Sequence, residues 1–389
     1  MPAPLRPSLP APPQPLPAFP TPPDRDPVDL AIRYRLGGQV PAPLAFPRLT
    51  QADIGRVEEF WLIDIEVRRP YQVRAVLRWV SPHAAWYLEE GLEVEEEALK
   101  EAAQAFEERI YPNLLSLLLT PEVRRQVEGL QWTVLNARLR GAAGFFSGTD
   151  LLPRSVHRYS NQRPLLSLSV PGLALGRGPY LSVLAHEFQH ALHHFADPTE
   201  ETWVNEGLSE LAAEVLGLRP YGWADFLRSP SNSLTEWPEE HSLAAPNYAA
   251  AHLFFRYLYQ RVGAEALPFL VTEASDGGEG VDAFLARRGL PFTFLDLFRE
   301  WAVATVLGER GEGRYAYQDG PGAALPRLLT VPDSVSGRLP PFGLQPVALR
   351  LPKGDYRVRF EGERTVPLLP TAPPQRVRLL VEQPGRQHR

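Results

Sequence analysis

The chain has 389 residues, of which 44% are hydrophobic and 22% charged, and this ordinary globular composition excludes wholesale disorder. Its 40 basic and 46 acidic residues give a net charge of −6, and no stretch is strongly basic, so nucleic acid is not the expected partner. No apolar run approaches the roughly 20 residues that a membrane-spanning helix needs. Because there is no cysteine, disulfides and zinc–thiolate sites are excluded, and any metal must be held by histidine and carboxylate.

The N-terminal segment is rich in proline, with 11 prolines among the first 23 residues. This composition is typical of a polyproline-like spacer or a disordered tail, and we expect residues 1–50 to form such a segment. The segment lacks the basic start and apolar stretch of a secretory signal. Pro-rich tethers often follow export signals, so two readings stay open: an extracytoplasmic or secreted protein whose signal has been removed, or a plain cytoplasmic tail.

Strands are expected from about residue 57. Segments rich in aromatic and β-branched residues predict five strands, over residues 60–65, 71–80, 84–88, 132–139 and 165–170. Apolar residues at helical spacing predict one long helix over 94–119. The glycine-rich stretch 141–148 is predicted to form turns.

Beyond residue 179 the pattern becomes helical. Helices are expected over residues 180–195, 202–216, 248–262, 264–274, 281–287 and 292–307, and short strands near the end over 347–351, 355–360 and 377–381. Strands followed by helices predict an α+β fold. We expect a β-rich subdomain over 51–178, a helical subdomain over 179–330 and a small β-rich tail over 331–389.

The helix expected over 180–195 carries two histidines and an acid at the spacing of a metal site. His186 and His190 are four residues apart, so both imidazoles lie on one face of the helix and can reach a single ion. Glu187 follows His186 at about 100° round the helix axis, beside the ion. A base at that position can take a proton from a water on the metal.

A carboxylate from the next helix is the expected third ligand. Glu206 and Glu210 lie 16 and 20 residues after His190 and share one face of the helix expected over 202–216. A hydrolytic zinc site needs three protein ligands and one open position. We expect Glu206 to bind the ion and Glu210 to accept a hydrogen bond from the outer nitrogen of a ligand histidine. The reverse assignment of the two glutamates stays open.

The motifs "AHEFQHALHH" and "ETWVNEGLSELAAE" resemble those of the gluzincin zinc metallopeptidases, the clan of thermolysin and aminopeptidase N. The residues of these motifs more closely resemble those of the hyicolysin-type neutral metallopeptidases. The likeness extends to "AAGFFSGTDLLP", "SNQRPLLSLSV" and "NYAAAHLFFRYLYQRVG". It covers roughly residues 60–307. The resemblance implies a gluzincin-like fold, a zinc cofactor and a polypeptide substrate.

The resemblance also implies a residue that stabilises the oxyanion, namely a tyrosine that opens a helix and is followed fifteen residues later by glycine. Tyr248 and Gly263 hold these positions, but Ala250 and Ala251 replace the Lys-Gly pair that usually follows the tyrosine. His252, one turn further along the same face, is the competing donor. Either side chain would supply a hydrogen bond to charge that develops only in the transition state.

Two related patterns are absent. The metzincin pattern would place Gly and His where His193 and Ala196 stand, and the aminopeptidase segment Gly-x-Met-Glu-Asn does not occur.

We therefore expect a zinc metalloendopeptidase, a hydrolase whose extended substrate adds to a sheet edge at residues 165–170. Two alternatives stay open: a non-catalytic surface or binding protein that keeps the zinc scaffold, and a metal-dependent hydrolase of non-peptide amides or esters. His193 and His194 are expected in packing or surface roles, and Trp203 in the core.

Overall fold

The structure is a computed structural model that describes residues 26–46, 48–218, 222–320, 322–330, 333–350, 357–362 and 375–382. The chain forms two compact units, residues 1–40 and residues 41–389. The first unit contains helix α1 (Pro27–Tyr34), which begins where the Asp26 carboxylate accepts the N–H groups of Val28 and Asp29. The segment expected to be a Pro-rich disordered tail or tether, residues 1–50, includes this capped helix, and its first 25 residues lie outside the described residues.

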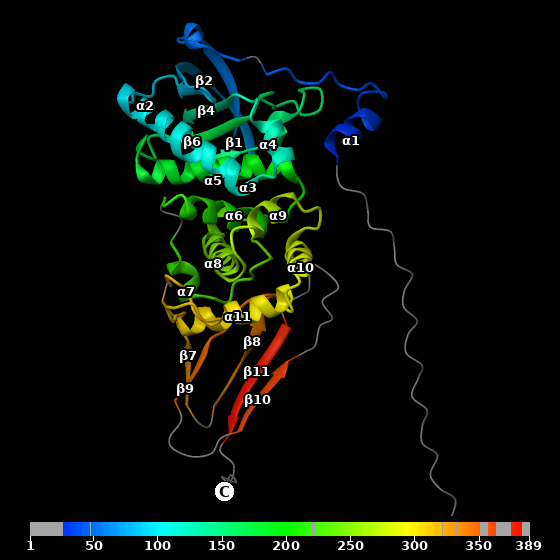
Figure 1. Cartoon of the computed structure of the whole chain (residues 1–389), viewed down its shortest axis with the longest axis vertical. Coiled ribbons are helices and arrows are strands. Elements are labelled where there is room, and N and C mark those ends of the chain that lie inside the picture. The colour runs from blue at the N-terminus through cyan, green and yellow to red at the C-terminus, as the bar shows by residue number, and fades with distance from the viewer. Residues whose placement is uncertain are drawn as a thin grey trace, which may run out of the picture. The chain divides into compact units, whose positions relative to one another are not determined.

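The second unit begins with a six-stranded mixed sheet in the order β1-β2-β3-β4-β6-β5 (Figure 1). The strands are β1 (Val57–Asp64), β2 (Arg69–Val80), β3 (Ala84–Glu89), β4 (Trp132–Ala137), β5 (Gly144–Phe146) and β6 (Leu165–Ser169). Strands β1, β2 and β3 form an antiparallel meander, β3, β4 and β6 run parallel, and β5 is antiparallel to β6. All five predicted strands are present.

The prediction that residues 165–170 form the sheet edge is wrong. Strand β6 lies between β4 and β5 and is hydrogen-bonded on both sides. The edge is β5, a three-residue strand inside the glycine-rich stretch that was expected to form turns. Glycine content predicts turns from local conformational freedom alone, whereas β5 is held by its pairing with β6.

Helices cover one face of the sheet and continue as a helical region (Figure 1). They are α2 (Glu96–Ala105), α3 (Tyr111–Leu118), α4 (Pro121–Val127), α5 (Gly178–Ala196), α6 (Thr202–Val215), α7 (Ala224–Arg228), α8 (Ala245–Val262), α9 (Ala266–Thr272), α10 (Gly277–Arg287) and α11 (Phe294–Leu307). The prediction of an α+β fold is confirmed.

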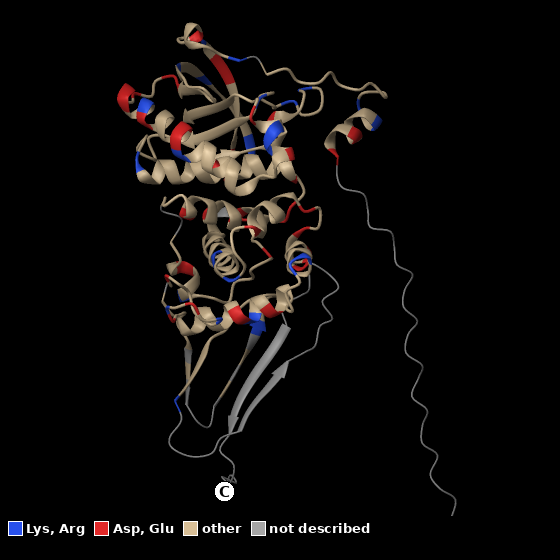
Figure 2. Cartoon of the chain, viewed as in Figure 1, with Lys and Arg blue, Asp and Glu red and all other residues tan. Residues whose placement is uncertain are grey.

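Among the described residues, no helix combines the length and the apolar character needed to span a bilayer. Acidic and basic residues are interspersed along these elements (Figure 2).

The helix predicted over 94–119 is continuous but changes its winding. A π-helical turn over Phe106–Ile110 joins α2 to α3. Pro112, in the first turn of α3, has no N–H to donate to the carbonyl group one turn earlier. A wider turn before a proline accommodates that missing hydrogen bond.

One hydrophobic core joins the sheet to the helical region. Trp132 of β4 packs edge-on against Phe188 of α5, with 5.0 Å between ring centroids. Trp203 of α6 is fully buried, as predicted, and stacks on Phe255 of α8 at 5.3 Å. Both pairs belong to a single buried cluster that extends from the sheet to α11. Because α5 packs against both the sheet and α6, its rotation about its own axis is fixed.

The C-terminal strands form two small sheets. Strands β7 (Arg327–Thr330) and β9 (Val347–Arg350) pair in parallel, and β8 (Asp333–Leu339), β10 (Arg357–Gly362) and β11 (Gln375–Glu382) form an antiparallel sheet in the order β10-β11-β8. A strand occurs at each of the three places predicted for the tail, while residues 351–356 lie outside the described residues.

Candidate metal centre

Helix α5 presents both predicted histidine ligands on one face. His186 and His190 lie one turn apart, with their ring centroids 4.6 Å from each other. The opposite face is made of fully buried apolar residues, among them Ala185, Phe188 and Leu192, and packs into the core. Burial of this apolar stripe turns the two imidazoles toward a pocket.

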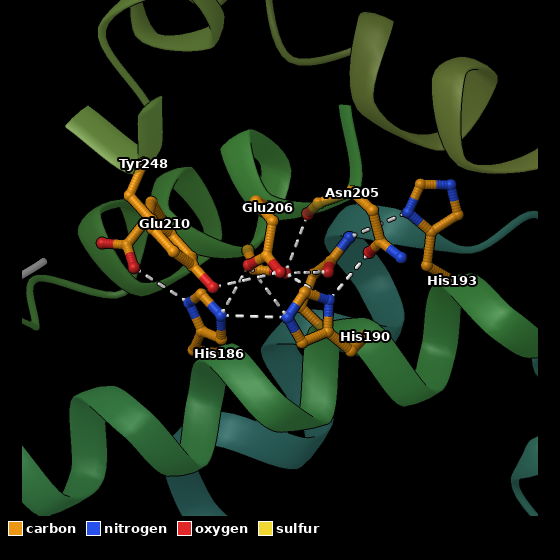
Figure 3. Close-up of polar contacts among 9 residues, drawn as sticks. His186, His190, His193, Asn205, Glu206, Glu210 and Tyr248 are labelled. Atoms are coloured by element: carbon orange, nitrogen blue, oxygen red, sulfur yellow. Dashed lines mark hydrogen bonds and ion pairs between the residues drawn. The ribbon is translucent and has the colours of Figure 1, made fainter. Parts of the chain in front are cut away.

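Helix α6 brings Glu206 to the same point. Its Oε2 atom lies 3.2 Å from Nε2 of His186 and 3.2 Å from Nε2 of His190, and the two Nε2 atoms are 2.9 Å apart (Figure 3). Within the described residues, these three side chains are the one group of histidine and carboxylate ligands that converges closely enough to hold a metal ion.

The outer nitrogen of each histidine is engaged by α6. Nδ1 of His186 donates to Oε1 of Glu210 at 3.0 Å. Nδ1 of His190 lies 2.8 Å from Oδ1 of Asn205 and 3.0 Å from Oγ of Ser209. Because Nδ1 carries the hydrogen in both neutral rings, the lone pair of each Nε2 points inward.

Three acceptors therefore face one another: two imidazole nitrogens and one carboxylate oxygen. None of the three has a hydrogen to share when both rings are neutral. A divalent cation at this point would relieve the repulsion among the lone pairs. Two imidazoles and a carboxylate are ligands that suit zinc, so the donor set fits this metal.

The charges of the two histidines and the neighbouring glutamates shift one another's pKa values. Burial alone would raise the pKa of Glu206, but the facing histidines hold it far below its usual range. Burial opposes charge on His186 and His190, yet the neighbouring glutamates, Glu206 above all, raise both imidazole pKa values. Protons would therefore compete with a metal ion for the same ring nitrogens.

Glu187 lies beside the cluster and is almost completely buried, with 6% of its surface exposed. Burial raises the pKa of its carboxyl group, while the charges of His186 and His190 act in the opposite direction. The edge strand β5 lies directly against it. A Cβ atom on Gly144 would come within 2.6 Å of Oε1 of Glu187 and 2.5 Å of Val183, so only glycine permits this approach.

A pocket of about 720 Å³ opens beside the cluster. The six predicted site residues that line it are His186, Glu187, His190, Glu206, Glu210 and Tyr248. Most of the remaining lining consists of small or apolar residues from the 141–146 segment, α5, α6 and α8. No lysine or arginine among the described residues lines this pocket.

Tyr248, in the first turn of α8, reaches the cluster. Its hydroxyl lies 3.4 Å from Oε1 of Glu206 (Figure 3). Its ring packs edge-on against Trp237, with 4.8 Å between the ring centroids. Burial raises the pKa of the phenol well above its usual range, and nearby glutamates raise it further. Tyr248 therefore keeps its proton and acts as a hydrogen-bond donor.

The structure places His252 outside the pocket. The ring is fully buried, with Nε2 lying 2.7 Å from Oε2 of Glu214 and Nδ1 accepting a hydrogen bond from Nε1 of Trp223 at 2.9 Å. Both ring nitrogens are engaged away from the metal ligands. Of the two predicted oxyanion donors, Tyr248 is the one that the structure brings to the site.

Asn205 and Ser209 were not predicted as part of the centre. Asn205 immediately precedes Glu206, and Ser209 donates to the side-chain carbonyl of Gln189 on α5. The sequence could have indicated both residues, because they lie on the face of α6 that also carries Glu206 and Glu210. His193, expected in a packing role, is fully buried, and Nδ1 lies 3.3 Å from the Gln189 amide.

We compared the sequence with protein-family models and with curated protein sequences, and neither comparison found a match.

Proposed function

We propose that this protein is a zinc-dependent metallopeptidase of the gluzincin type, and specifically an endopeptidase. The observation that carries the proposal is the convergence of Nε2 of His186, Nε2 of His190 and Oε2 of Glu206, at 3.2 Å or less from one another, beside a buried carboxyl group in a pocket. This arrangement leaves one side of the ligand set facing open space, as a hydrolytic site requires.

His186, His190 and Glu206 would hold the metal, and Glu210 would orient His186. When bound, zinc supplies Lewis acidity that makes a water more acidic and polarises a carbonyl group. With no cysteine in the chain, histidine and carboxylate are the available ligands for such an ion.

Glu187 acts as the general base. Its carboxylate accepts a proton from the attacking water while the oxygen of that water forms a bond to the carbonyl carbon of the substrate. The same carboxyl group then passes the proton to the amide nitrogen as the C–N bond breaks, which yields a carboxylic acid and an amine. Burial raises the pKa of Glu187, which suits a group that must both take and return a proton.

Tyr248 stabilises the charge that develops on the carbonyl oxygen. Its phenol remains protonated because its pKa is raised, and its hydroxyl is held 3.4 Å from the carboxylate of Glu206 at the edge of the ligand set. A hydrogen bond that forms only as this charge develops stabilises the transition state and lowers the activation barrier. It does not strengthen binding of the substrate in its ground state.

The edge strand supports an extended polypeptide substrate. Strand β5 pairs on one side with β6 and is the last strand in the order of the sheet, and its residues Gly144 to Phe146 line the pocket. A substrate chain can add to such an edge through main-chain hydrogen bonds. The pocket offers no described lysine or arginine to hold a terminal carboxylate, which favours cleavage within a chain.

The test is metal content together with proteolysis. Purified protein should contain about one zinc per chain, cleave an unfolded protein such as casein, lose that activity with a chelator and regain it with added Zn²⁺. Protein that binds no zinc, or that binds zinc and leaves casein intact under all these conditions, would refute the proposal.

A further inference from the structure

Helices α6 and α8 are joined by a row of polar contacts that continues beyond the pocket. Glu206 on α6 meets Tyr248 on α8 at 3.4 Å. Two turns further along α6, Glu214 meets His252 at 2.7 Å and the Nε atom of Arg256 at 2.8 Å. Residues 248, 252 and 256 are spaced by four, so they form one stripe along α8. The contact at the pocket, between Glu206 and Tyr248, and the contacts of Glu214 with His252 and Arg256 thus lie along the same interface between α6 and α8.

The backbones of these two helices approach closely. A Cβ atom on Gly207 would come within 2.9 Å of the carbonyl oxygen of Ala251 and would also strike the ring of Phe255. At such a separation, small shifts of α8 along α6 are transmitted directly to the side chains on its first turn. Glycine and apolar residues determine the distance between the two helices. Polar contacts, which are directional, determine the position of α8 along α6.

The hydrogen-bond pattern fixes the tautomer of His252. The indole N–H of Trp223 can only donate, so Nδ1 of His252 carries no hydrogen and accepts. Nε2 therefore carries the ring hydrogen and donates it to Glu214 at 2.7 Å. Glu214 also binds Arg256, whose guanidinium lies over the Trp223 ring at 5.0 Å. Both ring nitrogens of His252 and both carboxylate oxygens of Glu214 therefore have partners in this cluster.

The charge on Glu214 is stabilised by the same contacts. Burial would raise the pKa of its carboxyl group, but the hydrogen bond from His252 and the charge of Arg256 hold that pKa below its usual value. A charged acceptor makes the hydrogen bond from His252 stronger than a neutral pair would be. The bond therefore resists displacement of α8.

We propose that His252 is a positioning residue: through its hydrogen bond to Glu214 it fixes α8 against α6 and so holds the Tyr248 hydroxyl beside Glu206. The inference rests on the proposed peptidase function, in which Tyr248 stabilises the oxyanion. It assigns His252 no contact with substrate, because the ring is fully buried and lies outside the pocket lining. Displacement of a catalytic group by about 1 Å can cost up to about 10²-fold in rate.

Two substitutions of His252 separate its two hydrogen bonds. In His252→Gln the amide nitrogen can replace Nε2 and keep the bond to Glu214. In His252→Asn the shorter side chain can replace only Nδ1 and keep the bond from Trp223. We expect His252→Asn to lower kcat about tenfold or more with little change in KM, and His252→Gln to restore most of that loss. Glu214→Gln, which keeps the shape of the side chain, should lower kcat in the same way and serves if His252→Asn folds poorly.

A double-mutant cycle with Tyr248→Phe gives the decisive readout. If His252 acts through Tyr248, then His252→Asn costs nothing further in a chain that already carries Tyr248→Phe. A crystal structure of His252→Asn should show the Tyr248 hydroxyl displaced from Glu206 beyond 3.4 Å, with zinc content unchanged. Losses in kcat that multiply, or an undisplaced Tyr248, would overturn the role of His252. A wild-type chain without zinc-dependent cleavage would instead overturn the proposed function.

Discussion

Glu206 and Glu210 contact opposite nitrogens of the same imidazole. Oε2 of Glu206 lies 3.2 Å from Nε2 of His186, and Oε1 of Glu210 lies 3.0 Å from Nδ1 of that ring. The two acids are four residues apart on α6, so one helix face would supply, in the proposed site, both a metal ligand, Glu206, and the group that orients the ligand His186, Glu210.

This division of roles predicts an order of zinc affinities. Glu210→Ala removes an orienting hydrogen bond and is expected to weaken zinc binding about 10- to 100-fold. Glu206→Ala removes a ligand and is expected to weaken it more. Competition with a chromogenic chelator measures both affinities. If Glu210→Ala proved the more damaging change, the two glutamates would have to exchange roles.

Gly144 is predicted to be required for the position of Glu187. In Gly144→Ala the new methyl group would lie within 2.6 Å of the Glu187 carboxylate, so β5 or Glu187 must move. We expect a loss of at least about tenfold in kcat with zinc content preserved, because the base is displaced and the ligands are not.

The matched control is Gly129→Ala, since a Cβ atom there meets nothing within 4 Å. It is expected to retain wild-type activity. A Gly144→Ala protein as active as this control would mean that the edge strand does not set the position of the base.

Zinc binding is predicted to release protons. The pKa values of His186 and His190 are raised in the metal-free protein by the facing glutamates, against the effect of burial, so protons compete with zinc for the ring nitrogens. Zinc affinity should fall as the pH is lowered through neutrality. Titration calorimetry in two buffers of different ionisation enthalpy measures the protons released, and a pH-independent affinity with no proton release would contradict this account.

His193 is predicted to make stability depend on pH. Burial lowers the pKa of its imidazole from 6.5 to about 4, so between these values the unfolded chain binds a proton that the folded chain does not. Stability therefore falls as the pH is lowered through this window, by about 3 kcal/mol in total.

Urea unfolding of the chelator-treated protein between pH 4 and pH 7 measures that slope. His193→Gln should remove this part of the dependence, because a neutral amide has no proton to gain. An unchanged slope in the variant would show that His193 does not carry it.

Sequence reasoning was most successful where a periodic pattern and a chemical pattern coincide. The helix with His186 and His190 and the helix with Glu206 were both predicted, and the structure brings these three side chains together. Spacing of four residues fixes the relation of residues on one helix, and a short loop limits how the next helix can pack.

Relations between distant segments were harder to predict. Strand β5 depends on pairing with β6 and has only three residues, so its local sequence indicated turns. His252 shares a helix face with Tyr248 and was for that reason a candidate donor. Its partners Trp223 and Glu214 lie elsewhere in the chain, and only the fold reveals that they occupy both ring nitrogens.

The central claim is that Glu187 performs general-base chemistry beside a zinc ion held by its neighbours, and Glu187→Gln tests it most directly. The substitution keeps the size of the side chain and leaves His186, His190 and Glu206 intact. Zinc content and casein cleavage should be measured on the same preparation. The account predicts a full complement of zinc with a loss of at least about 10²-fold in rate. Full proteolytic activity in a zinc-loaded Glu187→Gln protein would contradict it.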